Sequence, residues 1–325
     1  KNKPRLVILD EPTSSLDAGL AEQLMAYIRK FVSGGGSVLL ISHILGEILS
    51  TATRVVVMKD GRIVADDAAA AFDNHKLVAA MGNVVKEQNW KRRTGDKTSS
   101  SPVVELEARG GRGQKLQAWK GEIIGLAGLG GHGQSDALLD IYLQANSSWR
   151  SKKKLDIAFV AGDRALNGTF PLLSIKNNLS VGPLRDLCNM LGLVSQEKEI
   201  DLSDSWKKRI EIRTPDMDHK ILSLSGGNQQ KVLFARALAT SADTVLMDDP
   251  MRGVDIGTKQ EVYEILRSEA EGGRTFLWYS TEMDEIRLCD RVYIFRDGVI
   301  EAELVGEDIT EENILAASFE GGAHS

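Results

Sequence analysis

The sequence lacks the features typical of secreted, membrane-spanning and nucleic-acid-binding proteins. Its only two cysteines, Cys188 and Cys289, lie far apart without metal-ligand spacing, which indicates reduced, buried thiols and no disulfide framework. No apolar run approaches the ~18 residues of a membrane span, so we expect no transmembrane segment. The net charge of −6 leaves no excess of cations for a phosphate backbone, which argues against nucleic acid as the main partner.

The 325 residues, 42% apolar and 26% charged, suffice for two soluble domains. Short runs rich in Val, Ile and Leu alternate with helical patterns, which predicts an α/β fold with a mostly parallel sheet. The expected strands cover residues 6–9, 38–41, 55–58, 123–127, 157–161, 245–247, 276–279 and 292–295. Residues 164–223 interrupt the alternation, and we expect them to form a mostly helical insertion.

One pattern occurs twice along the chain. Asp10-Glu11-Pro12 closes an apolar run early on, and Asp248-Asp249-Pro250 closes a similar run later. The two members of each of three pairs are separated by the same number of residues: Asp10 and Asp248, Asp17 and Asp255, His43 and Thr281. A repeat that keeps its register over such a stretch indicates a duplicated domain. We therefore expect the end of a first domain in residues 1–65, a linker in 66–101 and a second domain in 102–325.

The first copy carries residues suited to phosphate chemistry. Asp10 and Glu11 stand at the carboxyl end of a strand, where α/β sheets place their ligands. Asp10 suits a Mg²⁺ ion, which prefers oxygen ligands, and Glu11 can polarise a water that attacks a phosphate. His43 follows the next strand, from which its imidazole can reach the same phosphate or water. These three residues, with Asp17 in the intervening turn, form the first candidate site.

The second copy contains a glycine-rich loop between a strand and a helix. Residues 128–135 fit the phosphate-loop pattern G-x-x-x-x-G-K-[ST] through Gly128, Gly133 and Ser135. Gln134 stands where the pattern has lysine, so the charge that would meet the phosphates is gone. The loop also fits a dinucleotide fingerprint through Gly128, Gly130 and Gly133. That alternative is weak, because the nearest acidic residue, Asp156, opens the next strand instead of closing it.

A Ser-Gly-Gly turn lies a short way before Asp248 in the sequence. Leu224-Ser225-Gly226-Gly227-Asn228-Gln229-Gln230-Lys231 leads into a run with inward apolar positions at 232, 235 and 238. The turn exposes backbone amides at the start of a helix, and such N-termini bind anions. A simple helix cap is the alternative, but the position of the turn before Asp248 makes the motif specific.

Together these motifs resemble the ATP-binding subunits of ABC transporters, which are P-loop NTPases of α/β fold. The match is closest to the tandem ATPases that drive bacterial importers of ribose and related monosaccharides. Gly162-Asp163-Arg164 is also similar to that subfamily, which usually has glutamate before the Asp-Arg pair, so Gly162 is a departure. The resemblance implies ATP and Mg²⁺ as cofactors and a helical subdomain in the second copy.

In that family two domains enclose two ATP molecules, and each site combines residues of both domains. The resemblance implies an intact site with Asp10, Glu11, Asp17 and His43 opposite Ser225, Gly226, Gly227 and Gln229. It implies an eroded site with Gly128, Gly133, Gln134, Ser135, Asp248, Asp249 and Thr281. Asp249 is shorter than glutamate by about 1.5 Å, and a misplacement of about 1 Å can lower a rate ~10²-fold. We expect the second site to be nearly inert.

The resemblance further implies permease subunits in the bacterial inner membrane as partners and, through them, a periplasmic sugar-binding protein. The ATPase would be peripheral on the cytoplasmic face, with the region after Gly162-Asp163-Arg164 contacting the permease. Two other functions stay open from the residues alone. One is a soluble tandem ABC ATPase that acts on ribosomes or DNA, and the other is a non-hydrolysing nucleotide-binding scaffold.

The first copy is much shorter than the second. A long stretch separates Gln134 from Asp248, whereas the sequence begins only shortly before Asp10. A first phosphate loop, its adenine-stacking aromatic and a first Ser-Gly-Gly turn are therefore not in this sequence. We expect the chain to be a fragment truncated at the N-terminus that hydrolyses ATP poorly or not at all by itself.

Overall fold

The computed structural model describes residues 4–13, 18–42, 44–59, 61–80, 101–107, 114–147, 156–251, 254 and 256–319. Asp17, His43, Asp255 and residues 81–100 of the expected linker lie outside these ranges. The chain divides into two compact units, which are described separately. Unit 1 is Lys1–Asn89 with Asp255–Gly257, and unit 2 is Trp90–Val254 with Thr258–Ser325. In the described part of the chain, no helix has the length and apolar character to cross a membrane.

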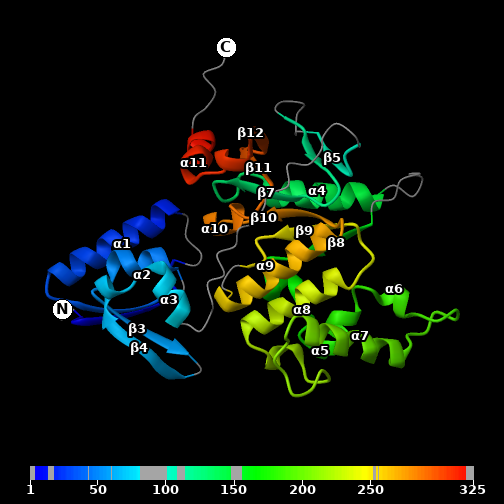
Figure 1. The fold of residues 1–325 in the computed structure, drawn as a ribbon, viewed down its shortest axis with the longest axis horizontal. Coiled ribbons are helices and arrows are strands. Elements are labelled where there is room, and N and C mark those ends of the chain that lie inside the picture. Colours follow the sequence, from blue (N-terminus) through cyan, green and yellow to red (C-terminus); the bar gives the residue numbers. More distant parts are fainter. Residues whose placement is uncertain are drawn as a thin grey trace, which may run out of the picture. The chain divides into compact units, whose positions relative to one another are not determined.

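Unit 1 contains a parallel strand pair and an antiparallel hairpin, each packed with helices (Figure 1). Its elements are β1 (Leu6–Asp10), α1 (Ala18–Ser33), β2 (Ser37–Ile41), α2 (Leu45–Thr51), β3 (Arg54–Lys59), β4 (Arg62–Ala68), the 3-10 helix η1 (Ala69–Ala71) and α3 (Asn74–Ala80). Val55, Val57, Ala69 and Leu77 form its small buried core. Residues 66–80, which the sequence analysis assigned to a linker, thus form the end of β4, η1 and α3.

Unit 2 is built on a six-stranded sheet in the order β12-β11-β7-β10-β9-β8, parallel except for β12. Its strands are β5 (Val104–Leu106), β6 (Leu116–Ala118), β7 (Ile123–Gly128), β8 (Ile157–Val160), β9 (Thr244–Asp248), β10 (Thr275–Tyr279), β11 (Arg291–Arg296) and β12 (Val299–Val305). The β5–β6 hairpin is separate from this sheet. The parallel sheet expected from the apolar runs is confirmed, because each expected strand of this half forms.

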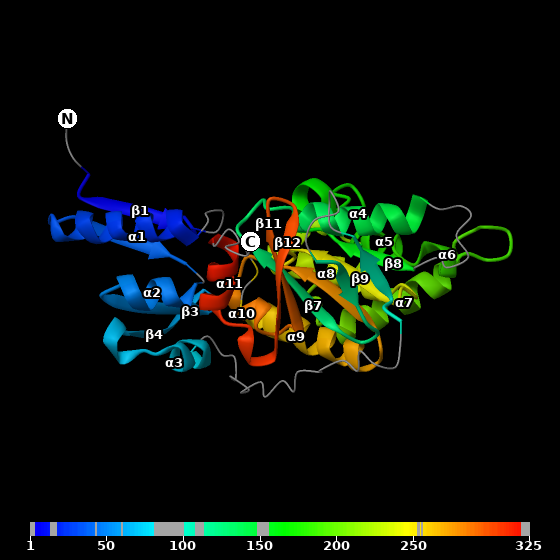
Figure 2. The ribbon, with the colours of Figure 1, turned by 90° about the horizontal axis from the view of Figure 1, so that it is seen from above.

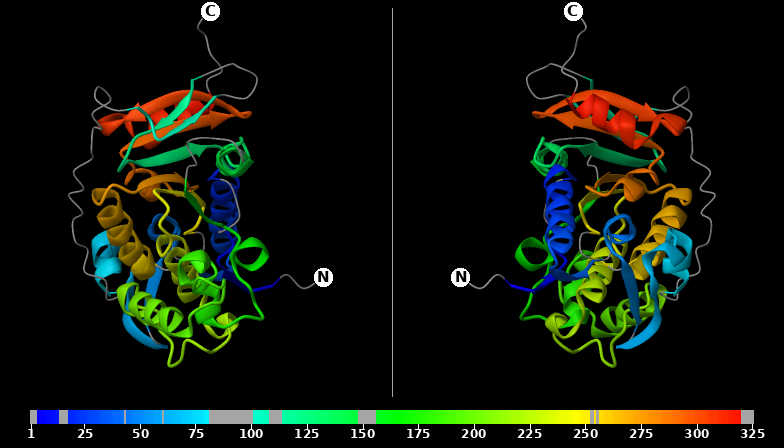
Figure 3. Two further views of the ribbon diagram at one scale, coloured as in Figure 1. Left: turned by 90° about the vertical axis from the view of Figure 1, so that its right-hand side faces the viewer. Right: turned by 90° about the vertical axis from the view of Figure 1, so that its left-hand side faces the viewer.

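Helices cover both faces of the large sheet (Figure 2). They are α4 (Gln134–Ser147), α5 (Ile175–Ser180), α6 (Leu184–Leu187), α7 (Gln196–Arg209), α8 (Gly226–Leu238), α9 (Ile256–Glu271), α10 (Met283–Ile286) and α11 (Glu311–Phe319), with short helices η3 (Arg164–Gly168), η4 (Ile221–Ser223) and η5 (Gly306–Asp308). α4 packs with the β5–β6 hairpin in one apolar cluster, and α8 and α9 belong to the larger cluster on the other face. Helix α11 contacts β7, β11 and β12 (Figure 3).

The region expected as a helical insertion is helical. It begins with the π-helix η3, continues through α5, α6 and α7, and ends with η4 before the Ser-Gly-Gly turn. Asp163 caps η3, because its Oδ1 accepts hydrogen bonds from the amides of Ala165 and Leu166. Ser174 caps α5 by accepting from the amide of Asn177. Polar side chains thus cap η3 and α5, whereas α6 and η4 have no side-chain cap.

The duplication inferred from the sequence is visible in the backbone of the two units. Strands β1 and β2 pair in parallel from Leu6 and Ser37, and β9 and β10 pair in the same register from Thr244 and Thr275, which are the equivalent positions of the second copy. The β3–β4 hairpin has a register shift between Val57 and Met58, and β11–β12 has one between Ile294 and Phe295. A shared irregularity at equivalent positions is a strong mark of a common fold.

The two copies differ in how their strands are covered. In unit 2, β7 lies between β11 and β10, and Leu246 and Leu277 are fully buried in the cluster with α4. In the described part of unit 1, no strand joins β3–β4 to β1–β2. The equivalent residues Ile8 and Leu39 are 62% and 54% exposed. Unit 1 therefore exposes an apolar sheet face whose equivalent is covered within unit 2.

Helix α1 is also only partly buried. Met25 and Ile28 are each 5% exposed, as a helix packed on a sheet requires. Leu20, Leu24, Ile28 and Phe31 recur at helical spacing and form the apolar stripe of this segment, but Leu20 is 49% exposed. The stripe therefore predicts the helix correctly, but its first turn is not covered in unit 1.

Candidate functional site

The carboxyl end of β9 brings Asp248 next to the start of α4. Ser135 Oγ donates a hydrogen bond of 2.6 Å to Asp248 Oδ1. Burial raises the pKa of the Asp248 carboxyl group, and the hydrogen bond from Ser135 opposes this rise. A hydroxyl and a carboxylate side by side are oxygen ligands of the kind that Mg²⁺ prefers. These two residues fit a magnesium–phosphate group at the sheet edge.

The backbone of Asp249, directly after β9, is left-handed and no longer extended as in the strand. Its φ is 46°, its amide donates to the carbonyl of Tyr279 at 2.8 Å, and its side chain is largely buried. The carboxylate accepts hydrogen bonds from the amide and the Oγ1 of Thr281, at 3.4 and 3.3 Å. Asp249 and Thr281, which stand where the first copy has Glu11 and His43, are therefore joined by hydrogen bonds at the end of β9.

The glycine-rich loop runs between β7 and α4. Gly128 has a φ of 126°, and a Cβ there would lie 2.3 Å from the carbonyl oxygen of Phe295. Gly133 has a φ of 101°, and its Cβ would lie 2.8 Å from the Cα of Gly298. Both glycines are thus required by the left-handed backbone and by the close β11–β12 hairpin. The chain folds here as a phosphate loop does, with the helix N-terminus directly after it.

Gln134 occupies the lysine position of this loop and is buried. Its Nε2 donates to the carbonyl oxygens of Leu129 and Ala127, at 3.0 and 3.3 Å. The amide therefore closes the loop on itself and supplies no positive charge to a phosphate. The loop amides and Ser135 fit the phosphate group of a nucleotide, but Gln134 does not replace the missing cation.

A buried charged cluster lies behind this strand end. Glu285 accepts hydrogen bonds from Ser280 Oγ at 2.6 Å and from the Tyr263 hydroxyl at 3.0 Å. Lys259 Nζ lies 3.2 Å from Glu285 and also pairs with Glu282. Burial raises the pKa of Glu285 to about 7, and the charge of Lys259 opposes the rise. The cluster fixes Ser280 and hence the position of Thr281 after it.

In the first copy, Asp10 and Glu11 end β1 as Asp248 and Asp249 end β9. Glu11 has a φ of 44°, and its amide donates to the carbonyl of Ile41 at 2.9 Å. Glu47, the equivalent of Glu285, accepts from Thr13 Oγ1 and Ser42 Oγ, at 2.9 and 3.2 Å. The backbone that presents Asp249 is therefore repeated at Glu11, which carries the longer side chain.

The Ser-Gly-Gly turn starts helix α8. Ser225 is its N-cap residue, but no side-chain hydrogen bond caps the helix amides. Instead, Asn228 Nδ2 donates to Ser225 Oγ at 3.0 Å, and Gln229 Nε2 donates to the carbonyl of Leu224 at 2.9 Å. Helix amides without a side-chain cap are available to an anion. Gly226 and Gly227 carry no side chains of their own, and Arg164 lies beside Gly226.

The segment after β8 joins the strand end to this turn. A Cβ on Gly162 would lie 2.1 Å from the carbonyl oxygen of Asp248. The glycine that departs from the subfamily pattern is therefore required by the contact with β9. Arg164, which follows closely in the sequence, lies against Gly226, whose Cβ would come within 2.7 Å of Arg164 Nη2.

Sequence reasoning did not assign a role to two buried cations of α8. Lys231 is 2% exposed, pairs with Glu261 of α9 and donates to the carbonyl of Glu211. Arg236 donates to the carbonyl oxygens of Gly168 and Asn178, both at 2.6 Å, and burial lowers its pKa to about 10. The signal for both was a charged residue inside an apolar helical run, which indicates a buried partner.

Known proteins are similar to this chain. Residues 112–252 match the family model described as ABC transporter. Ribose import ATP-binding protein RbsA 2 of Rhizobium etli is 34% identical over 343 residues, covering 99% of this chain and 68% of the relative. Ribose import ATP-binding protein RbsA of Ruegeria sp. is 33% identical over 332 residues, covering 96% of this chain and 65% of the relative. The chain thus spans about two thirds of the length of these relatives.

Solved structures agree on the fold. The dimeric structure of MJ0796, a bacterial ABC transporter cassette, has a TM-score of 0.50 and 25% identity, covering 63% of this chain and 97% of that one. A model of ribosome-bound archaeal Pelota and ABCE1 has a TM-score of 0.66 over 94% of this chain and 53% of that one, at 19% identity, and this likeness concerns the fold alone. With relatives a third identical along almost its whole length, the chain belongs to the ABC transporter family of nucleotide-binding proteins.

Proposed function

We propose that this chain is an ATP-binding subunit that energises the import of a ribose-like monosaccharide. The names of the relatives support this cargo class. The chain itself would bind Mg²⁺-ATP and would not contact the sugar. Its partners would be permease subunits and, through them, a periplasmic sugar-binding protein, so it would work at the cytoplasmic face of the inner membrane.

The observation that carries the proposal is the repeated strand end with two different acidic residues. Glu11 and Asp249 have nearly the same φ, 44° and 46°, and each amide donates to the neighbouring parallel strand. Asp249 accepts hydrogen bonds from Thr281, and Glu11 carries a side chain that is longer by one methylene group. Glu11 would accept the proton of the water that attacks the terminal phosphate. Asp249 would bind without promoting hydrolysis.

The other proposed roles follow from the chemistry of each residue. Asp10 in the first copy, and Ser135 with Asp248 in the second, would hold Mg²⁺, which neutralises phosphate charge when it is bound. His43 and Asp17 would complete the first site. Ser225, Gly226, Gly227 and Gln229 would bind the end of the triphosphate in that site through helix amides and the side chains of the turn.

ATP hydrolysis tests this assignment in a protein that joins this chain to a first glycine loop and is assembled with its permease. Glu11→Gln removes the proton acceptor with little change in shape, so we expect kcat to fall at least ~10²-fold. Asp249→Asn is the matched control at the equivalent position, and we expect kcat to stay within about twofold. The assignment is wrong if Asp249→Asn lowers kcat as much as Glu11→Gln does, or if neither variant changes it.

A further inference from the structure

A buried acidic group joins helix α9 to the turn that carries Thr281. Glu285 of α10 is 1% exposed, and its carboxylate accepts hydrogen bonds from Ser280 Oγ at 2.6 Å and from the Tyr263 hydroxyl at 3.0 Å. Lys259 of α9 is 5% exposed, and its Nζ lies 3.2 Å from the same carboxylate. Three donors from two separate parts of unit 2 therefore converge on one carboxylate.

The turn is fixed on both sides of Thr281. Ser280 Oγ accepts a hydrogen bond from the amide of Glu282 at 3.0 Å, and the carboxylate of Glu282 pairs with Lys259. Thr281 lies between these two residues, and its amide and Oγ1 donate to Asp249 at 3.4 and 3.3 Å. The contacts around Lys259 thus reach the end of β9 through Thr281.

The first copy has different residues at most of these positions. Glu47 is the equivalent of Glu285, but the equivalents of Lys259, Tyr263 and Glu282 are Ala21, Met25 and Ile44. Helix α1 therefore offers neither a cation nor a hydroxyl at the positions where α9 offers both. The charged cluster belongs to the second copy.

The cluster of Lys259, Glu282 and Glu285 contains more acid than base. One ammonium group is shared by two carboxylates, of which that of Glu282 is 34% exposed and that of Glu285 is buried. A buried carboxylate with a shared cation takes up a proton more readily than one in water. Burial raises the pKa of Glu285 to about 7, Lys259 opposes the rise, and the charges of Glu282 and Asp249 add to it.

The titratable groups around Glu285 come from each element packed against it. They are Lys259 and Tyr263 of α9, Glu282 and Asp284 at α10, Cys289 after α10 and Asp249 after β9.

We propose that this cluster is a proton-linked clamp that holds Thr281 on Asp249. An ionised Glu285 accepts hydrogen bonds, donates none and attracts Lys259, so it binds all three of its donors. A protonated Glu285 has no charge for Lys259 and must donate its own proton, so it binds fewer of them. The clamp therefore closes as the pH rises through neutrality and opens below it. It needs no nucleotide, so its test is independent of the proposed function.

Urea unfolding of unit 2 tests the proton uptake, with the fluorescence of Trp278 as the signal. The folded state keeps a proton on Glu285 that the unfolded state has released, so stability falls as the pH rises from about 4.5 to about 7. Relative to that of Glu285→Gln, the unfolding constant of the wild type should increase at least about tenfold between about pH 5 and about pH 7.5. Asp284→Asn, at a side chain of α10 that is 93% exposed, is the matched control and should follow the wild type within about twofold.

Amide hydrogen exchange at about pH 7.5 tests whether the cluster holds the turn. Peptides covering residues 280–286 should exchange at least about tenfold faster in Glu285→Gln and in Lys259→Met than in the wild type. Peptides covering β7 and β8 should stay within about twofold. Lys259→Met also removes the cation that opposes proton uptake, so its loss of stability should continue to a pH at least about one unit higher.

Each measurement has an outcome that overturns the inference. The same pH dependence in the wild type and in Glu285→Gln would mean that Glu285 takes up no proton near neutrality. Unchanged exchange of residues 280–286 in both variants would mean that the cluster does not hold the turn. A Lys259→Met protein with the pH dependence of the wild type would reduce Lys259 to a packing role and contradict its place in the clamp.

Discussion

At the scale of single residues, Gly162 shows how a backbone contact determines a side chain. The sequence marks this position as a departure from the glutamate usual in the resembling subfamily. The structure gives the reason, because the carbonyl of Asp248 occupies the place where a Cβ would be. The spacing of motifs along a chain cannot reveal such a contact, since the two residues lie far apart in sequence.

We expect Gly162→Ala to destabilise unit 2 by about 1–3 kcal/mol, because the Cβ forces the end of β9 to move. Urea unfolding followed by the fluorescence of the buried Trp278 measures the change. Gly130→Ala is the control in the nearby glycine loop, where a Cβ would meet no atom within 4 Å. Its stability should stay the same or rise slightly. Equal losses in both variants would contradict the proposed contact.

Other residue positions were predictable from the motifs. Glu11, Asp248, Asp249 and Ser135 lie at the ends of strands or the start of a helix, as the apolar runs around them indicate. The hydrogen bonds from Thr281 to Asp249 could not be predicted, because they depend on the left-handed turn after β9. Sequence spacing thus locates the strand ends, while the direction of each carboxylate comes from the backbone.

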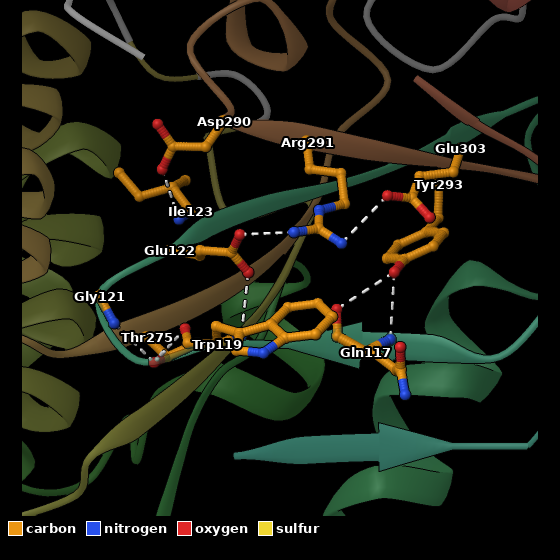
Figure 4. A network of polar contacts seen from close by, with 10 residues as sticks. All are labelled: Gln117, Trp119, Gly121, Glu122, Ile123, Thr275, Asp290, Arg291, Tyr293 and Glu303. Atoms are coloured by element: carbon orange, nitrogen blue, oxygen red, sulfur yellow. Dashed lines mark hydrogen bonds and ion pairs between the residues drawn. The ribbon is translucent and has the colours of Figure 1, made fainter. Parts of the chain in front are cut away.

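At the scale of secondary structure elements, the two β-hairpins carry an equivalent ion pair in different surroundings. In unit 1, Arg54 pairs with Asp66 at 2.7 Å, and the arginine side chain is 69% exposed. In unit 2, Arg291 is 3% exposed and pairs with Glu122 at 2.6 Å and Glu303 at 3.0 Å. Figure 4 shows Arg291 above the ring of Trp119, whose centroid lies 4.6 Å from its Cζ.

We expect Arg291→Met to destabilise unit 2 by about 3–5 kcal/mol, because it leaves the buried Glu122 without its charged partner. Arg54→Met, the equivalent change at an exposed pair, should have no measurable effect on unit 1. Urea unfolding of the two variants, followed by circular dichroism, makes the comparison. Similar urea midpoints of unfolding for the two variants would show that burial does not determine how much this ion pair contributes to stability.

Sequence reasoning missed the strands of the β5–β6 hairpin and the second strands of the other two hairpins, β4 and β12. Strands β4 and β12 mix apolar residues with charged ones such as Asp66 and Glu303. A search for short apolar runs finds buried parallel strands and overlooks such edge strands. The pairing of β11 with β12 is set by the tight turn between them, in which Asp297 and Gly298 both have positive φ.

At the scale of the whole molecule, the two copies of the fold share their strand registers and differ in how their strands are covered. The duplication was predictable because a constant offset between equivalent motifs survives in the sequence. The different covering of the two sheets follows from contacts between distant segments, chiefly those of β7 and α4 with β9 and β10. Sequence reasoning did not anticipate which strand face unit 1 leaves exposed.

We expect amide hydrogen exchange to distinguish the equivalent strand pairs. Peptides covering β1 and β2 should exchange at least about 100-fold faster than those covering β9 and β10, because exposed sheets open locally at low free energy. Exchange followed by mass spectrometry on the intact chain provides the measurement. Equal protection in the two pairs would mean that another part of the protein covers the face that includes Ile8 and Leu39.

The two-stranded β1–β2 sheet also has a consequence for handling the protein. Among the described residues, neither outer edge of this sheet pairs with another strand, and one side is rich in aliphatic side chains. We expect molecules that meet there to add strand to strand, so that association grows with concentration. Dilute preparation should therefore keep the polypeptide dispersed.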